Sequence, residues 1–264
     1  TSSVTENGKP VDARTYAYDR AGRLVKESPS APENGQRKTE NVIEYTYGYL
    51  DKVLKISRNP GSANGASISS QPSAISYSYG PDGMLLGKTK DGKTESWTWD
   101  GLALLARGDT TYVNEPHASG GVPLFARQLK PTSTSSLEAQ EADAILLNDY
   151  LGTTLDTLAA SDNGQRKTDN GKLLTALGTS SNGTQETDTG ARFTGKPYDP
   201  DLQSYVFPFR NYRPDLARWT TADPSGFPDG PNGHYYAPVG TSGIDPVGLA
   251  EDLLFRKGWG IEKY

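Results

Sequence analysis

The sequence contains no cysteine, only two histidines and a single methionine. Without cysteine the chain cannot form disulfides, thiolate metal sites or a cysteine nucleophile. The two histidines, His117 and His234, cannot build a histidine-rich metal centre. We therefore expect neither a metal ion nor another cofactor.

Long apolar runs and clusters of basic residues are also missing. No apolar stretch approaches the length of a membrane span, and the first residues lack the basic-then-apolar pattern of a signal peptide. The 27 Lys and Arg residues face 32 Asp and Glu, which gives a net charge of −5 and no basic cluster long enough to track a phosphate backbone. We expect no membrane span and no nucleic-acid partner, and the chain starts as if it were cut from a longer one.

Glycine and proline are abundant instead. With 29 Gly and 18 Pro in 264 residues, long helices are disfavoured, whereas short strands joined by frequent turns are favoured. Only 34% of the residues are hydrophobic, but 15 Tyr and 4 Trp can bury their rings and keep a polar atom in contact with water. The composition therefore favours a polar all-β protein with room for a sizeable core.

A motif of two aromatic residues separated by one position, followed by Asp or Gly and then an apolar residue, recurs along the first part of the chain. Its copies are Tyr16–Leu24, Tyr45–Leu54, Tyr77–Leu85 and Trp97–Leu102. Aromatic residues two apart lie on one face of a strand, the Asp/Gly segment turns, and the apolar residue begins a second strand. Each copy is predicted to be a β-hairpin, and tandem hairpins form one long, curving antiparallel sheet.

The pattern changes after residue 126. A polar segment at 130–143 is predicted to be a linker or a short helix, and Ala144–Leu155 to form two strands around Asn-Asp-Tyr-Leu-Gly. Asn148 and Asp149 could be ligands, but Asn and Asp are typical turn residues, so a turn is the favoured interpretation.

Two matching tetrads lie near the end of the sequence. They are Asp223-Pro224-Ser225-Gly226 and Asp245-Pro246-Val247-Gly248, the second followed by Leu249. Each tetrad alone describes a type I turn. Together, their aspartates could share one proton, so that one acts as base toward a water and the other as acid toward a scissile carbonyl.

Taken in order, these segments resemble the C-terminal part of an RHS-repeat (YD-repeat) protein. Tyr16–Leu24 matches the YD repeat, and the run from Arg192 to Pro224 resembles the RHS-associated core, which ends in the pair of tetrads. The resemblance implies a spiral of hairpins forming a shell that is closed by the core and encloses a toxin or effector segment. It divides the chain into YD repeats at 1–129, the linker or short helix at 130–143, the core at 144–249 and the start of a variable C-terminal segment at 250–264.

In this family the core is similar to an aspartic protease in mechanism and cuts its own chain just after the second tetrad. Carried over to this sequence, the resemblance implies Asp223 and Asp245 as the catalytic pair and Arg218 as the cation that favours the ionised partner. The bond cut would join Leu249 to Ala250, and one turnover would release the effector into the shell.

The resemblance also implies a bacterial protein that is secreted or at the cell surface. Its expected partners are its own C-terminal segment or a toxin cargo, further RHS repeats upstream or in another chain, and components of a secretion system or toxin complex. Two alternatives stay open: a non-catalytic shell or scaffold, and an extracellular adhesion module whose YD sheet binds glycans.

Overall fold

The computed structural model describes residues 5–6, 9–10, 14–29, 42–59, 72–116, 121–130, 140–149, 151–160, 166–168, 178, 192–227, 230–236, 243–245, 247–249 and 252–253. The chain divides into two compact units, Thr1–Glu95 and Ser96–Tyr264. The described residues form β-strands and turns with a single 3-10 turn, and they contain no helix long and apolar enough to cross a membrane.

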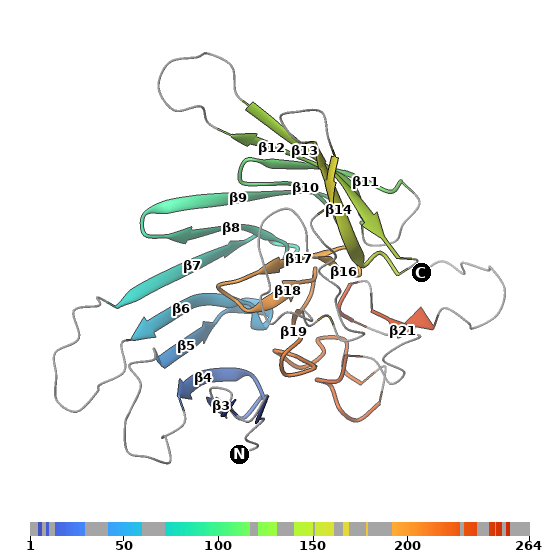
Figure 1. Cartoon of the computed structure of the whole chain (residues 1–264). Coiled ribbons are helices and arrows are strands. Elements are labelled where there is room, and N and C mark those ends of the chain that lie inside the picture. The colour runs from blue at the N-terminus through green and yellow to red at the C-terminus, as the bar shows by residue number, and fades with distance from the viewer. Residues whose placement is uncertain are drawn as a thin grey trace. The chain divides into compact units, whose positions relative to one another are not determined.

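The first unit is a series of antiparallel hairpins. Its strands are β1 (Thr5–Glu6), β2 (Lys9–Pro10), β3 (Arg14–Tyr18), β4 (Leu24–Pro29), β5 (Val42–Tyr47), β6 (Val53–Asn59), β7 (Ser73–Tyr79) and β8 (Leu85–Lys90), with the 3-10 turn η1 (Tyr49–Asp51) between β5 and β6. From β3 to β8 each strand pairs with the next one along the chain (Figure 1). β9 (Lys93–Asp100) crosses the boundary between the units.

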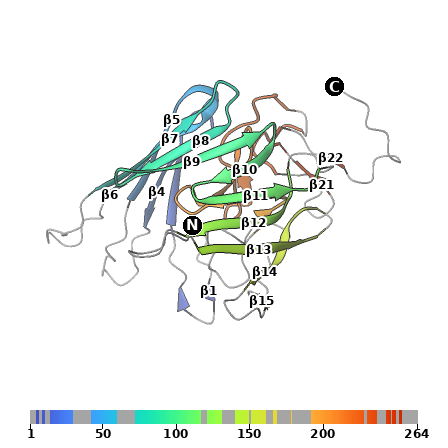
Figure 2. The ribbon, with the colours of Figure 1, turned by 90° about the horizontal axis from the view of Figure 1, so that it is seen from above.

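The second unit continues with the same kind of pairing. Its larger sheet holds β9, β10 (Ala103–Arg107), β11 (Thr110–Asn114), β12 (Pro123–Lys130), β13 (Gln140–Asn148), β14 (Thr154–Ala160) and β15 (Arg166–Thr168), again in sequence order. Figure 2 shows β10 to β14 side by side. The predicted all-β fold of tandem antiparallel hairpins is confirmed, including a hairpin at each of the predicted motifs.

The second aromatic residue of a motif connects its hairpin to the preceding one. The register shifts at Tyr47 and at Tyr79, which marks a bulge before the turn. The hydroxyl of Tyr47 donates to the carbonyl of Leu24 at 2.7 Å, and that of Tyr79 donates to the carbonyl of Val53 at 3.0 Å. Each ring also lies under a cation of the preceding hairpin, with the Arg23 guanidinium 5.0 Å from the Tyr47 ring centroid. The motif therefore specifies the contact between neighbouring hairpins as well as the hairpin itself.

The segment predicted as a linker or short helix is flanked by strand at both ends. β12 extends to Lys130 and β13 begins at Gln140, so the last residues of the 130–143 segment are strand, while 131–139 lie outside the described residues. Six consecutive residue pairs join the two strands, from Phe125 opposite Ile145 to Lys130 opposite Gln140. Arg127 and Asp143 add a bidentate ion pair at 2.8 and 3.0 Å. Cross-strand pairing thus outweighs the helix propensity of this polar segment.

The favoured interpretation of Asn148 and Asp149 is correct, because both residues build a turn. Oδ1 of Asp149 accepts hydrogen bonds from the backbone N–H groups of Leu151 and Thr153. At the first YD turn, Oδ1 of Asp19 accepts in the same way from the residues two and four positions later. Nδ2 of Asn148 donates to the carbonyl of Pro123 at 2.8 Å. Asn148 therefore takes the place of the second tyrosine of a YD motif, and the repeat continues past residue 129.

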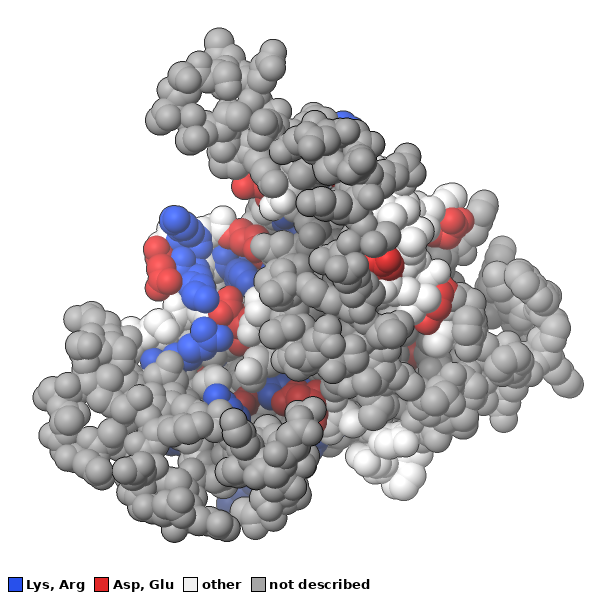
Figure 3. All heavy atoms as spheres, viewed as in Figure 1, with Lys and Arg blue, Asp and Glu red and all other residues white. Residues whose placement is uncertain are grey.

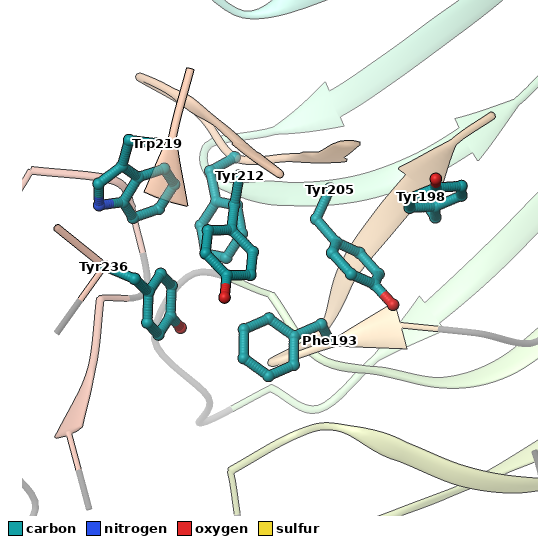
Figure 4. Close-up of a cluster of buried hydrophobic side chains, with 7 residues drawn as sticks. Phe193, Tyr198, Tyr205, Tyr212, Trp219 and Tyr236 are labelled. Carbon is teal, nitrogen blue, oxygen red and sulfur yellow. The ribbon is translucent and has the colours of Figure 1, made fainter. Parts of the chain in front are cut away.

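A smaller meander lies within the second unit and carries its aromatic core. Its strands are β16 (Arg192–Phe193), β17 (Lys196–Asp199), β18 (Ser204–Val206), β19 (Asn211–Arg213) and β20 (Arg218–Trp219), and a separate pair is formed by β21 (Gly243–Ile244) and β22 (Asp252–Leu253). Seven buried rings pack together here: Phe193, Tyr198, Tyr205, Phe207, Tyr212, Trp219 and Tyr236 (Figure 4). The Arg107 guanidinium, which lies over the Trp97 ring, donates to the carbonyl of Tyr198 at 2.9 Å and joins the meander to the larger sheet.

Charged side chains on the described surface are mixed in sign. Figure 3 shows Lys and Arg next to Asp and Glu on the face that it draws. Lys26 and Glu44, for example, form an ion pair at 2.9 Å. This arrangement agrees with the absence of a basic cluster in the sequence.

The contact between hairpins can be tested with Tyr79→Phe. The variant keeps the ring but leaves the Val53 carbonyl without its hydrogen bond, so we expect the free energy of unfolding to fall by about 1 kcal/mol in urea denaturation. Tyr49→Phe is the matched control because that side chain is 82% exposed, and we expect a change below about 0.5 kcal/mol. Equal effects of the two substitutions would contradict the proposed role of the second tyrosine.

Candidate active site

Each tetrad folds as a turn around its own aspartate. Oδ1 of Asp223 accepts a hydrogen bond from the backbone N–H of Ser225 at 2.8 Å. Oδ1 of Asp245 accepts three, from Val247, Gly248 and Leu249, at 3.3, 2.6 and 3.0 Å. The turns predicted from sequence are therefore present, and they fix the direction of both carboxyl groups.

Glycine at the end of the second tetrad is required by both conformation and space. Gly248 has a φ of 83°, in the left-handed region that favours glycine, and a Cβ atom there would lie 3.1 Å from the backbone nitrogen of Arg210. The second tetrad can therefore approach the loop before β19 closely only because it ends in glycine.

One arginine joins the two aspartates. Nη2 of Arg210 lies 2.7 Å from Oδ2 of Asp223 and 2.9 Å from Oδ2 of Asp245. The three side chains are only 2%, 3% and 0% exposed. Nε of Arg210 donates to the carbonyl of Gly248 at 2.6 Å and Nη1 to that of Gly233 at 3.1 Å. The site is thus a buried pair of carboxyl groups that share one guanidinium nitrogen.

The aromatic core supports this guanidinium. The central carbon of the Arg210 guanidinium lies 4.3 Å from the centroid of the Trp219 ring. That ring packs edge-on against Phe207 and Tyr212. Stacking on an aromatic face holds the plane of the guanidinium and shields it from water. Figure 4 shows Trp219, Tyr212 and Tyr236 close together at one side of the cluster.

Burial is the largest influence on the pKa of Asp245. It raises the pKa of Asp245 to about 6, although Arg210 and the three backbone N–H groups act in the opposite direction. Burial likewise raises the pKa of the Tyr236 hydroxyl, and the nearby charge of Asp245 adds to the effect. Tyr236 therefore stays neutral, while Asp245 can take up a proton in mildly acidic solution.

Both ends of the Leu249 residue are hydrogen-bonded by the tetrads. Its N–H donates to Oδ1 of Asp245, and its carbonyl oxygen lies 3.1 Å from Oγ of Ser225. The same Ser225 hydroxyl is 2.5 Å from Oδ1 of Asp223. The carbonyl of the predicted cleavage site is therefore linked to Asp223 through one hydroxyl group, whereas Ala250 lies outside the described residues.

The structure brings the two predicted aspartates together and pairs them with an arginine that sequence analysis did not single out. Arg218, the arginine that the family resemblance implies as the cation beside the aspartates, lies in β20. Its Nε donates to the carbonyl of Trp219 at 3.2 Å. Arg210 occupies the bridging position because it precedes β19, next to the turn of the second tetrad. A buried carboxyl pair needs a cation nearby, but spacing alone cannot choose among the arginines of this region.

The chemical capacity of the site is acid–base catalysis by carboxyl groups. Among the described residues, no group of three or more His, Asp and Glu side chains is placed to hold a metal ion. Two carboxyl groups and one guanidinium carry a net charge of −1 when both aspartates are ionised and none when the pair holds one proton. The pair can thus present one base and one acid at the same time.

Solved structures of similar fold were found by structural comparison. The crystal structure of TcdB2-TccC3-TEV has a TM-score of 0.53 and 17% identity, over 89% of this chain and 13% of that chain. The crystal structure of TcdB2-TccC3 has a TM-score of 0.50 and 16% identity, over 89% of this chain and 14% of that one. A Tc holotoxin pore of Photorhabdus luminescens has a TM-score of 0.48 and 14% identity, over 94% of this chain and 13% of that chain.

The likeness shows a shared fold, and this chain spans about 13% of the length of the chain in the TcdB2-TccC3-TEV structure. No protein-family model matches the chain, and no curated protein matches its sequence.

The bridging role of Arg210 predicts a large loss of stability in Arg210→Met. The substitution keeps much of the apolar stem but leaves two buried carboxyl groups without their cation, so we expect the free energy of unfolding to fall by about 3–5 kcal/mol. Arg218→Met is the control and should cost clearly less in the same urea denaturation experiment. A greater loss in Arg218→Met would contradict the assignment of Arg210 as the bridge.

The raised pKa of Asp245 predicts a dependence of stability on pH. Because the folded chain holds this pKa at about 6 and the ordinary value is 3.8, the folded state binds a proton more readily than the unfolded state between those values. Stability contributed by this group is therefore greatest at the acidic end and falls as the pH rises through about 6. Relative to Asp245→Asn, which cannot titrate, the unchanged protein should lose about 1–3 kcal/mol over this interval in urea denaturation. Parallel pH profiles of the two proteins would refute the expectation.

Proposed function

We propose that this chain is part of an RHS shell whose core domain cuts its own backbone after Leu249 by an aspartic-protease-like mechanism. The observation that carries the proposal is the position of Leu249, since one tetrad binds its N–H and the other approaches its carbonyl. A scaffold would need only the turns, whereas hydrolysis needs a carbonyl beside a buried carboxyl pair. The geometry therefore favours the protease over a non-catalytic shell.

Hydrolysis by the pair is chemically balanced. One carboxylate removes a proton from water, the water oxygen bonds to the Leu249 carbonyl carbon, and the protonated partner donates to the carbonyl oxygen. When the carbon–nitrogen bond breaks, the leaving nitrogen of Ala250 takes up the proton that came from water, and one hydroxyl proton of the tetrahedral intermediate returns to the partner carboxylate. Arg210 offsets the negative charge that stays on the pair.

A single turnover demands little of the site. The segment to be cut is covalently attached and already hydrogen-bonded at Leu249, so its effective concentration is very high. No pocket that captures a separate substrate is required. The product is a new C-terminus at Leu249 and a freed segment that begins at Ala250.

The fold supports the remaining parts of the proposal. Hairpins that pair in series are suited to a shell wall, and the fold is similar to that of the chain in the TcdB2-TccC3-TEV structure, of which this chain would match a small part. We propose as partners the chain's own C-terminal segment or a toxin cargo, further RHS repeats, and toxin-complex components, in a secreted or cell-surface bacterial protein. Adhesion through sugar stacking has less support, because the first aromatic residue is buried in three of the four repeats, at Tyr45, Tyr77 and Trp97.

Intact-mass measurement after denaturation tests self-cleavage. We expect the unchanged protein to separate into 1–249 and 250–264, and Asp223→Asn and Asp245→Asn to stay at the full 28.4 kDa. Asp215→Asn serves as the control, since that carboxylate pairs with Arg213 outside the site and its loss should leave cleavage intact. If the protein without substitutions remains one chain after denaturation, the protease hypothesis is rejected and the scaffold hypothesis remains.

A further inference from the structure

The Ser225 hydroxyl lies between a carboxyl of the pair and the carbonyl of Leu249. Its Oγ atom is 2.5 Å from Oδ1 of Asp223 and 3.1 Å from the Leu249 carbonyl oxygen. A hydroxyl has one proton to donate but can also accept one. It donates to Asp223 when that carboxyl is ionised, and it can bond both oxygen atoms at once only when Asp223 is protonated and donates to Oγ.

Hydrogen bonding decides where a proton on the pair can reside. Oδ1 of Asp245 accepts three backbone N–H groups, and its Oδ2 accepts Nη2 of Arg210. Every one of these partners is a donor, so a proton on Asp245 would find no acceptor among them. Oδ1 of Asp223 differs, because among its described partners the Ser225 hydroxyl can accept a proton. When the proton of the pair lies on Asp223, it can point at Ser225.

We infer that Ser225 is a further catalytic residue, whose hydroxyl relays a proton from Asp223 to the carbonyl oxygen of Leu249. The inference rests on the proposed self-cleavage and names a group that this reaction would use. It assigns distinct tasks to the two aspartates, with Asp245 as the base toward water and Asp223 as the acid.

The relay balances at each step. Asp245 takes a proton from water as the water oxygen bonds to the carbonyl carbon, while Ser225 gives its proton to the carbonyl oxygen and is reprotonated by Asp223. This produces a tetrahedral diol. Asp245 then protonates the leaving nitrogen as the carbon–nitrogen bond breaks, and the second diol proton returns through Ser225 to Asp223. Both aspartates end in their starting states, and one water is consumed.

The turn itself does not require a hydroxyl at this position. In the matching tetrad the corresponding residue is Val247, and its backbone N–H alone completes the turn with Asp245. The Ser225 N–H does the same for Asp223. A stabilising role in the turn therefore does not account for the hydroxyl, which is also the only side-chain group among the described residues with a hydrogen bond to the Leu249 carbonyl in this structure.

Substitution of Ser225 separates the relay from a role in folding. The full chain is made by cell-free synthesis, samples are quenched in denaturant at intervals, and intact mass gives the fraction still joined. We expect Ser225→Ala and Ser225→Val to slow cleavage by roughly 10²-fold or more, as expected for the loss of a donor to the reacting oxygen. Ser225→Thr keeps the hydroxyl and should remain within about threefold of the unchanged protein. Ser225→Ala and Ser225→Val should show only a small loss of stability in urea denaturation, since the turn keeps its backbone hydrogen bonds, so all three variants remain folded.

The outcomes distinguish this inference from the proposed function. Cleavage that is blocked by Asp223→Asn but proceeds in Ser225→Ala at the unchanged rate would overturn the relay and leave the protease standing. Equal slowing in Ser225→Ala and Ser225→Thr would also overturn it, because the hydroxyl would not be the group that matters. If the protein without substitutions is never cut, both the relay and the proposed self-cleavage are overturned. Slow cleavage in Ser225→Ala with recovery in Ser225→Thr supports the relay.

Discussion

Two buried carboxyl groups sharing one guanidinium is the interaction on which the site depends. Carboxylates that are nearly free of solvent repel each other and lose hydration, and only a nearby cation makes their close approach tolerable. Arg210 supplies that cation and uses its other nitrogen atoms to bind the carbonyls of Gly233 and Gly248. The same side chain therefore neutralises the pair and holds the two chain segments that carry it. Without it the two carboxyl groups would be buried with no cation between them.

The guanidinium can do this because the short meander around it is stabilised by side chains. Strands of two to four residues offer few backbone hydrogen bonds, so β16 to β20 depend on buried rings for much of their stability. Tyr212 and Tyr236 lie 4.5 Å apart between ring centroids, and both pack near Trp219, on which Arg210 stacks. The rings thereby fix the position of the arginine, and the arginine fixes the aspartates. The aromatic core is part of the site although it performs no chemistry.

Sequence reasoning succeeds here where the determining interactions are local. Alternating aromatic residues and an Asp/Gly turn specify a hairpin within about ten residues, which is why the first four hairpins were predicted. β13 was missed at its start because Gln140–Asp143 is polar and suits a helix, and only pairing with β12 makes it a strand. The tetrads identified both aspartates, but the choice of Arg210 over Arg218 depends on which loop faces the second turn. Long-range placement of that kind has no local signature.

The two tetrads show that equal motifs do not give equal groups. Both place Asp before a proline and end in glycine, and both turns are closed by backbone N–H groups. The residue at the third position then separates them, since Ser225 adds a hydroxyl beside Asp223 and Val247 adds none beside Asp245. An acid and a base must differ in what their oxygen atoms contact. The pair therefore acquires its asymmetry from the variable position of the motif and from the number of backbone N–H groups at each aspartate, which is three at Asp245 and one at Asp223.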